Sequence, residues 1–156
     1  MRVKAFGVFV FAMVLAGAGA SGPVLAQDDG SGEDEEEITG AGTLTAALAA
    51  AGVPGGGDAA GSGSFKVDVD AGAGDYCYVL TVRGLRGASK AQLREGAAGE
   101  GGKAVFDLEV TGANGDLCRG GDPKVLKAML DNPAGYHVQV ASTAKPGGAI
   151  RGQLGK

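Results

Sequence analysis

The stretch YHVQVASTAKPGGAIRGQL, from Tyr136 to Leu154, decides the fold class that we expect of this chain. Up to Ala141, apolar and more polar side chains alternate with a period of two, the pattern of a strand with one face in the core and one in solvent. Lys145-Pro146-Gly147-Gly148 follows, and proline before glycine predicts a type II turn or a slightly longer hairpin loop. The alternation then resumes up to Leu154, so the stretch predicts an antiparallel hairpin.

Further segments between glycine-rich turns show the same alternation, and we expect short strands at residues 65–69, 76–83, 89–95 and 104–110. Residues 43–48 fit either an opening strand or a fragment of helix, because alanine dominates them. Asp122-Pro123 predicts the start of a short helix, since an acidic N-cap precedes proline at the first helical position, and Asn132-Pro133 predicts its end. Residues 112–121, which include Cys118, are expected to form a loop.

Six or seven short strands with one short helix predict an all-β domain, an antiparallel β-sandwich, over residues 40–156. Few aromatic side chains are present, and those expected at the heart of the core are Phe65, Tyr76, Tyr78, Phe106 and Tyr136. The length of the chain suits one such domain with one core.

Residues 1–26 have the features of a secretory signal peptide: two basic residues, an apolar run from Ala5 to Leu15, and small residues before a cleavage site after Ala26. The alternative is a membrane anchor, but the apolar run is shorter than the roughly 18 residues that a spanning helix needs. Residues 27–39 are acidic and rich in glycine and serine, which predicts a disordered linker. We therefore expect a secreted or extracytoplasmic protein without a membrane span after cleavage.

Charge is divided unevenly between the linker and the domain. Seven of the 18 acidic residues lie between Asp28 and Glu37, whereas 12 basic residues face 11 acidic ones from Gly40 onward. The domain is therefore nearly neutral. It also lacks the basic patch with interleaved aromatic side chains that is typical of nucleic-acid-binding surfaces, so we expect no nucleic-acid partner.

Cys77 and Cys118 are the only cysteines. In an oxidising compartment, two cysteines predict a disulfide, and a loop of about 40 residues gives it a value of roughly 4 kcal/mol in the chain-entropy model. A two-cysteine metal site is the weaker alternative, because the close Cys or His spacing of zinc sites is absent and the chain has one His.

The order of these elements resembles the CHRD domain, the module repeated in chordin and found singly in many secreted bacterial proteins. The most specific likeness is PGGAIRGQL at residues 146–154, after the YHVQV strand. YCYVLTVRGL (residues 76–85) and AQLREGAAGEGG (residues 91–102) are weaker likenesses. The resemblance covers residues 40–154 and implies an immunoglobulin-like or superoxide-dismutase-like sandwich.

Many members of that family carry three histidines that could converge on a metal, and the matching positions here are Gln92, Arg94 and Ala141. None of these side chains is a transition-metal ligand of comparable strength. We therefore expect no metal, no cofactor and no catalytic residue. His137 falls one position from a ligand slot, and a lone histidine on the polar face of a strand is expected at the surface.

These observations favour a non-enzymatic binding or structural module at the cell exterior, expected to be monomeric, whose partner is an unknown extracellular protein or an envelope or matrix component. The expected binding face is polar and consists of Gln92, Arg94, His137, Gln139 and Arg151, provided that the family fold makes their strands neighbours. The alternative is a metal-binding or dismutase-like sandwich, which the substituted histidine positions disfavour. A chaperone-like or export-associated role of the acidic linker is a third possibility.

Overall fold

The computed structural model describes residues 37–156. The predicted signal peptide and most of the predicted acidic linker lie outside the described residues.

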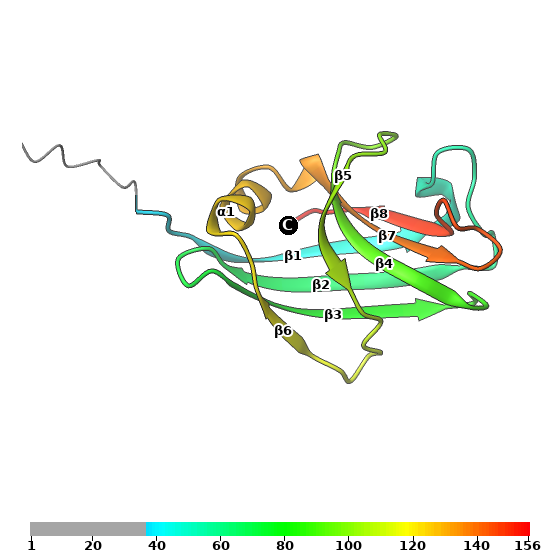
Figure 1. Ribbon diagram of the computed structural model, residues 1–156, viewed down its shortest axis with the longest axis horizontal. Helices are drawn as coiled ribbons and strands as arrows, with labels where there is room; N and C mark the ends of the chain where they lie inside the picture. The colour runs from blue at the N-terminus through cyan, green and yellow to red at the C-terminus, as the bar shows by residue number, and fades with distance from the viewer. Residues whose placement is uncertain (1–36) are drawn as a thin grey trace, which may run out of the picture. The chain divides into compact units, whose positions relative to one another are not determined.

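The described part of the chain is an all-β domain with one short α-helix, as the sequence predicts (Figure 1). Its strands are β1 (Ala41–Ala49), β2 (Ser62–Asp70), β3 (Asp75–Arg83), β4 (Ala88–Glu95), β5 (Lys103–Leu108), β6 (Leu117–Gly120), β7 (Tyr136–Ser142) and β8 (Ile150–Gln153). The helices are α1 (Pro123–Asp131) and two single 3₁₀ turns, η1 (Ala50–Gly52) and η2 (Pro133–Gly135). All neighbouring strands are antiparallel, in the order β5-β4-β7-β8-β1-β2-β3-β6.

This sheet curls, so that its two ends meet across the core (Figure 1). The segment after β5 returns to β3, where the Glu109 N–H donates to Tyr78 Oη (2.9 Å) and the Thr111 N–H to the Leu80 carbonyl oxygen (3.0 Å). In the middle of the sheet, β8 approaches β1 closely. A Cβ at Gly152 would lie 2.3 Å from the Ala47 carbonyl oxygen, so this approach requires glycine.

The core is formed by the inward faces of the strands and closed at one end by α1. Leu44, Leu80 and Val138 are completely buried, and Leu126 and Met129 of α1 pack into the same cluster. The helix begins as predicted, with the Asp122 carboxylate accepting a hydrogen bond from the Lys124 N–H (2.9 Å). Four of the five predicted core aromatics are buried, and the fifth, Phe106, is half-buried against Tyr76 at 4.6 Å between ring centroids.

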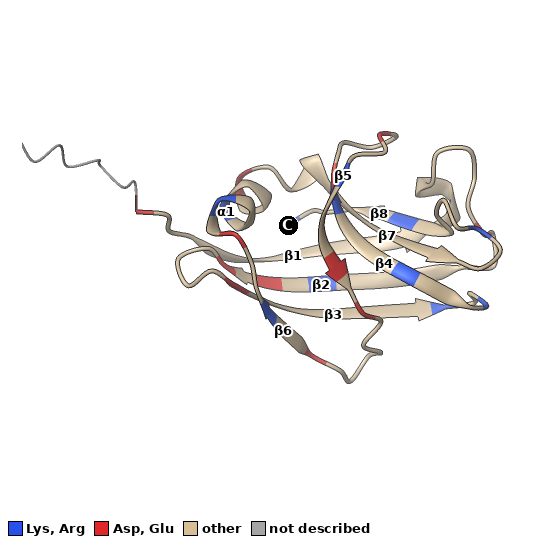
Figure 2. Cartoon of the chain, viewed as in Figure 1, with Lys and Arg blue, Asp and Glu red and all other residues tan. Residues whose placement is uncertain are grey.

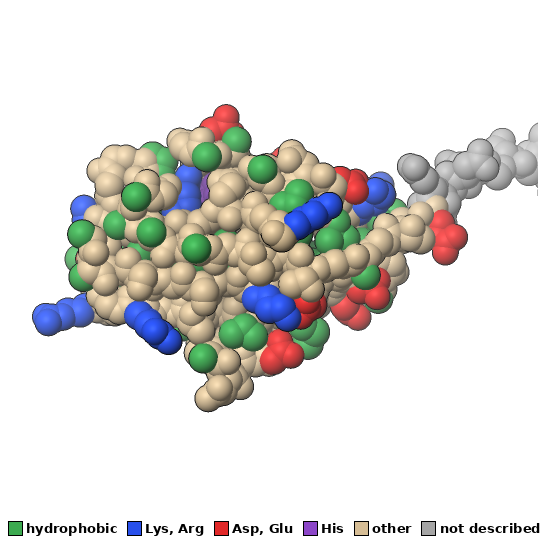
Figure 3. Space-filling view, turned by 180° about the vertical axis from the view of Figure 1, so that it is seen from behind, with side chains coloured by type: hydrophobic (Ala, Val, Ile, Leu, Met, Phe, Trp, Pro, Cys, Tyr) green, Lys and Arg blue, Asp and Glu red, His purple; other side chains and the backbone are tan. Residues whose placement is uncertain are grey.

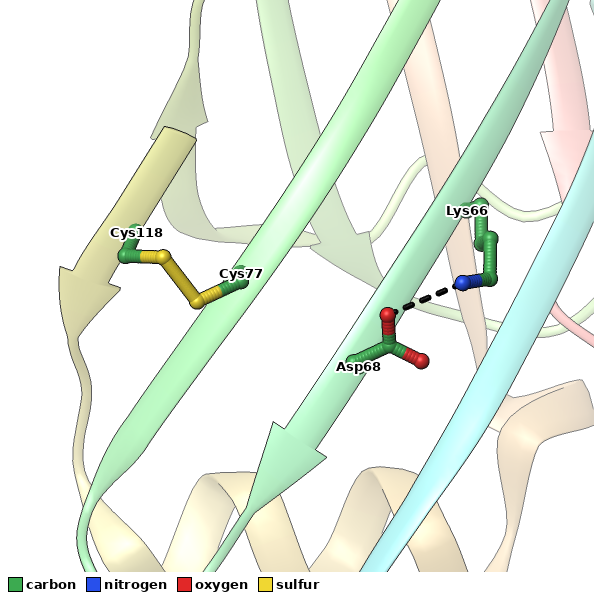
Figure 4. Close-up of a disulfide and its surroundings, with 4 residues drawn as sticks. All are labelled: Lys66, Asp68, Cys77 and Cys118. Atoms are coloured by element: carbon green, nitrogen blue, oxygen red, sulfur yellow. Dashed lines mark hydrogen bonds and ion pairs between the residues drawn. A yellow bond between two sulfur atoms is a disulfide. The ribbon is translucent and has the colours of Figure 1, made fainter. Parts of the chain in front are cut away.

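The predicted disulfide is present and joins β3 to the edge strand β6 (Figure 4). Cys77 and Cys118 are directly paired residues of the two strands. The prediction of a loop at residues 112–121 is therefore wrong in its second half. The short LCRG segment has no clear alternation of apolar and polar side chains. It forms a strand because it pairs with β3 and is linked to it by the disulfide.

Two other expectations change in the structure. Residues 43–48, which left strand and helix open, belong to strand β1, where Leu44, Ala46 and Leu48 face the core. With β1 and β6, the described residues contain eight strands, more than the six or seven expected. Among residues 37–156, none of the helices has the length and apolar character that a bilayer crossing demands.

Candidate functional site

The five residues of the predicted binding face come together on one face of neighbouring strands β4, β7 and β8. Gln92 is paired with Gln139, and Arg94 with His137, across the β4–β7 ladder. Gln139 is in turn paired with Arg151 across the β7–β8 ladder. These side chains project from the face opposite the core, because their sequence neighbours, such as Leu93 and Val138, are buried in the core cluster.

The expectation that His137 lies at the surface is wrong. His137 is 0% exposed and Arg151 is 5% exposed, although both lie on the outer face. Two loops cover this face, the β4–β5 loop (residues 96–102) and the β7–β8 loop (residues 143–149), through contacts described below. Alternation along a strand shows which residues share a face, but it does not show whether a distant loop covers that face.

Backbone carbonyl groups of the β4–β5 loop are held by side chains of the sheet. Arg94 donates from Nε to the Gly101 carbonyl oxygen (3.0 Å) and from Nη2 to that of Gly102 (2.6 Å). Arg151 donates from Nη1 to the Glu100 carbonyl oxygen (2.5 Å). His137 Nδ1 lies 3.0 Å from the Gly96 carbonyl oxygen. Gln153 Nε2 also donates to the Gly96 carbonyl oxygen (3.0 Å), so four nitrogen-bearing side chains fasten the loop to the outer face.

Gln139 connects the same face to the β7–β8 loop. Its Oε1 accepts hydrogen bonds from Arg151 Nε (3.0 Å) and Nη2 (2.6 Å), and its Nε2 donates to the Gly147 carbonyl oxygen (2.9 Å). The loop is of the longer kind that the sequence left open, since residues 143–149 separate β7 from β8. Within it, the Gly148 N–H donates to the Lys145 carbonyl oxygen (3.1 Å) and closes a turn, and the positive φ (+136°) falls at Gly148. A type II turn would have placed it at Gly147.

Between the two loops lies a pocket of about 350 Å³, with a floor formed by the outer face. Its lining residues are Lys90, Gln92, Arg94, Gly101, Gln139, Ala141, Pro146, Gly147 and Arg151. All three positions that match the family's histidines, Gln92, Arg94 and Ala141, therefore line one pocket. Of the predicted face, only His137 is not among the lining residues.

Lys90 is the functional candidate that the sequence analysis missed. It lies two residues before Gln92 on β4, so the period of two places it on the same face, and this spacing is the signal that could have identified it. Lys90 is exposed, lines the pocket, and forms no side-chain hydrogen bond or ion pair with the other residues that the structure describes.

The pocket contains basic side chains but no acidic one: Lys90, Arg94 and Arg151 line it without an Asp or Glu. Figure 2 shows blue segments on β4 and β8, the strands that carry these three residues. The acceptors that the two arginines use are amide and carbonyl oxygens, and the ion pairs found among residues 37–156 include neither arginine. Burial, and then the charge of Arg94, lower the pKa of Arg151.

His137 lies beneath this charged region and is electrostatically disfavoured as a cation. Burial lowers the pKa of His137, the hydrogen bond with Gly96 opposes this shift, and the charges of Arg151 and Arg94 add to the lowering. A carbonyl oxygen only accepts, so the neutral imidazole carries its proton on Nδ1. Its buried Nε2 has no hydrogen-bond partner among the described residues.

The arrangement suits recognition of a negatively charged group better than coordination of a metal ion. Guanidinium and ammonium groups are donors only, and cations repel a metal. Within residues 37–156, no group of three or more His, Cys, Asp or Glu side chains is placed to hold a metal ion.

Comparisons with known proteins agree with the resemblance seen in the sequence. A search of curated proteins and a search of solved structures each found no match to this chain. A comparison with protein-family models matched residues 44–154 to the CHRD domain. The match runs from the middle of β1 to the residue after β8 and includes every strand of the pocket floor. The chain therefore belongs to the CHRD domain family.

Proposed function

We propose that this protein is a secreted, non-enzymatic binding module of the CHRD type, built on a sandwich-like frame. In this proposal it acts as a monomer at the cell exterior and captures an envelope or matrix component in the pocket on β4, β7 and β8. The observation that carries the proposal is the pocket itself: residues from three strands and two loops converge on about 350 Å³, a volume in the range of small-ligand sites.

Three other observations support this proposal. The Cys77–Cys118 disulfide is typical of proteins from oxidising compartments. The CHRD domain is a module of extracellular proteins, and the first 26 residues have the pattern of a signal peptide. The pocket lining offers donors that can bind a ligand, but no nucleophile with an adjacent base.

A neutral obstruction at the pocket mouth tests this proposal independently of charge. Gly147 lines the pocket, has no positive φ, and a Cβ added there would meet no atom within 4 Å, so Gly147→Tyr adds bulk without backbone strain. Gly120 on β6 is the matched control, because an added Cβ would meet one atom, at 3.8 Å. Immobilised mature protein carrying either change is exposed to native cell-surface extract, and captured components are quantified by mass spectrometry.

We expect Gly147→Tyr to reduce capture by at least about tenfold, since it fills the space that the ligand needs, while Gly120→Tyr captures like the unchanged protein. Equal capture by both variants would remove the pocket from the proposed function. Elemental analysis of the same samples tests the alternative of a metal-binding or dismutase-like sandwich, because one firmly bound transition metal per chain would favour it.

A further inference from the structure

We propose that the pocket binds an oxyanion group, a carboxylate, sulfate or phosphate, carried by an extracellular ligand. This inference rests on the proposed function, since it names the chemistry of the ligand that the same pocket would take.

No described carboxylate pairs directly with the arginines of the pocket, and the one in their hydrogen-bond network, Asp107, is reached only through the Gln92 amide. Arg151 is 5% exposed, yet its described acceptors are the amide oxygen of Gln139 and the carbonyl oxygen of Glu100. Such neutral acceptors satisfy hydrogen bonds but leave the formal charge uncompensated, which is unfavourable for a buried ion. A bound anion would supply the missing negative charge.

Hydrogen-bond donors of these basic side chains remain available. Arg94 and Arg151 each use three of their five N–H groups in the described hydrogen bonds, which leaves two on each guanidinium. The Lys90 ammonium group has three donors and no described partner at the same pocket. Guanidinium groups pair with oxyanions through two parallel hydrogen bonds, and such charge-assisted bonds are among the stronger polar contacts in proteins.

The volume of about 350 Å³ corresponds to roughly ten water molecules, so the pocket has room for an oxyanion together with further ligand atoms. The side-chain amides of Gln92 and Gln139 also line the pocket, and each Nε2 keeps a second N–H beside the bond that it already donates, which can contact the hydroxyl groups of a sugar. Acidic saccharides combine hydroxyl groups with carboxylate or sulfate, so they fit this lining.

A wider charge asymmetry supports an anionic ligand. On the face seen in Figure 3, most of the Asp and Glu side chains lie toward the right of the view, whereas Lys and Arg side chains occur on both halves, so the left half has mainly basic charge. Exposed Arg86 and Lys145 stand in the β3–β4 and β7–β8 connections, next to strands that form the pocket. Long-range attraction toward this end would raise the association rate of an anion at low salt.

The structure also offers a competing explanation, in which the arginines serve only to fasten the β4–β5 loop. Replacing Arg94 or Arg151 would then unfasten the loop whether or not a ligand binds. Lys90 separates the two explanations, since its side chain holds no loop and forms no described contact that folding needs. The decisive variant is therefore Lys90→Glu, and the matched control is Lys124→Glu, the same charge change on exposed α1.

The experiment is isothermal titration calorimetry of the mature protein with its disulfide intact and without a His tag, in a buffer free of phosphate and sulfate. The probes are sodium sulfate, sodium phosphate and trigalacturonate, with maltotriose as the neutral saccharide. Circular dichroism and thermal melting establish that each variant is folded.

We expect at least one of the anionic probes to bind and maltotriose not to bind. Lys90→Glu should weaken the dissociation constant of that probe by at least about tenfold, whereas Lys124→Glu changes it less than about twofold. Tighter binding of trigalacturonate than of sulfate or phosphate identifies a saccharide-borne carboxylate, and the reverse identifies an inorganic oxyanion.

The proposal is overturned if none of the anions binds, or if both lysine variants bind the anion equally. Failure of this inference is distinguishable from failure of the proposed function. If Gly147→Tyr abolishes capture from extract while no anion binds, the pocket is a binding site for a different chemistry. If anions bind but Gly147→Tyr leaves capture unchanged, the proposed function fails.

Discussion

The β2–β3–β6 side of the domain and the β4–β7–β8 side differ in the partners of their charged side chains. On the first side, oppositely charged side chains pair at the surface: Lys66 with Asp68 (2.9 Å) and Arg119 with Glu109. On the second side, the guanidinium groups of Arg94 and Arg151 use only neutral oxygens among their described acceptors. On the first side both of these positive charges are paired with a negative one, whereas the second side leaves positive charge that a ligand can neutralise.

The two sides also differ in how they are stabilised. Strands β3 and β6 are joined covalently by Cys77–Cys118, and Figure 4 shows this link on the strand next to the one that carries the Lys66–Asp68 pair. The β4–β7–β8 side is held together by hydrogen bonds from side chains to loop carbonyls. Stability and ligand binding are therefore expected to respond to different substitutions.

The largest effect is expected from removing the disulfide. Replacing Cys77 and Cys118 by serine restores the conformational freedom of an unfolded loop of about 40 residues and should lower the free energy of unfolding by about 4 kcal/mol. Urea denaturation monitored by circular dichroism measures this change. The folded fraction of the variant should still bind the anionic probe with an affinity within about twofold of the unchanged protein, because the pocket lies on other strands.

The control is the unchanged protein treated with a reductant under the same conditions, which should lose a similar amount of stability. Loss of probe binding in a variant that is still folded would contradict the independence of the two sides, since it would mean that the β3–β6 edge stabilises the pocket.

Much of the fold follows from the sequence because alternation and turn residues are local signals. Alternation predicts β3 with nearly the right boundaries and the central part of β2, which begins three residues earlier than expected, and Asp122-Pro123 marks the start of α1. β6 was not predicted, because its four residues form an exposed edge strand without an alternating pattern of apolar and polar side chains. Its strand character depends on pairing with β3, which is a non-local contact.

The pocket could be predicted only in part, for a related reason. The period of two placed Gln92, Arg94, Gln139 and Arg151 on outer faces, and the family fold made their strands neighbours. Coverage of that face by the loops was not predictable, because it depends on backbone carbonyl groups of residues 96–102. Every residue has such a carbonyl group, so the sequence contains no signal for this contact. The burial of His137 was missed for the same reason.

A smaller effect is expected on acidification, through His137. The pKa of this imidazole is lowered in the folded protein, so below its ordinary value of about 6.5 the unfolded chain binds more protons than the folded one. The free energy of unfolding should therefore decrease as the pH falls from about 6.5 to about 5, and should not respond to His137 above that range. Urea denaturation at half-unit pH intervals measures this dependence.

His137→Gln is the matched variant, because an uncharged amide can still donate to the Gly96 carbonyl oxygen but does not titrate. Its stability should be nearly constant over the same pH range, since most carboxyl groups titrate nearer pH 4. Parallel loss of stability in both proteins would mean that acid sensitivity originates elsewhere than in the β4–β7–β8 side.

The smallest effect is expected from the exposed ion pair between Lys66 and Asp68, whose side chains are 56% and 55% exposed. A double-mutant cycle with Lys66→Ala and Asp68→Asn, measured by urea denaturation at pH 7, should give a coupling free energy below about 1 kcal/mol, because solvent and salt screen such pairs. Hydrogen bonds from Thr43 and Lys66 lower the pKa of Asp68 from 3.8. The contribution of the ion pair to stability is therefore present above pH 3.8 and disappears as the pH falls through the lower pKa of the folded state.

A coupling free energy of several kcal/mol would contradict the view that ion pairs on this side contribute little to stability. The β2–β3–β6 side would then depend on electrostatics as much as the pocket does. The lack of a direct ion pair to Arg94 or Arg151 among the described residues would no longer distinguish a ligand site from a structural one.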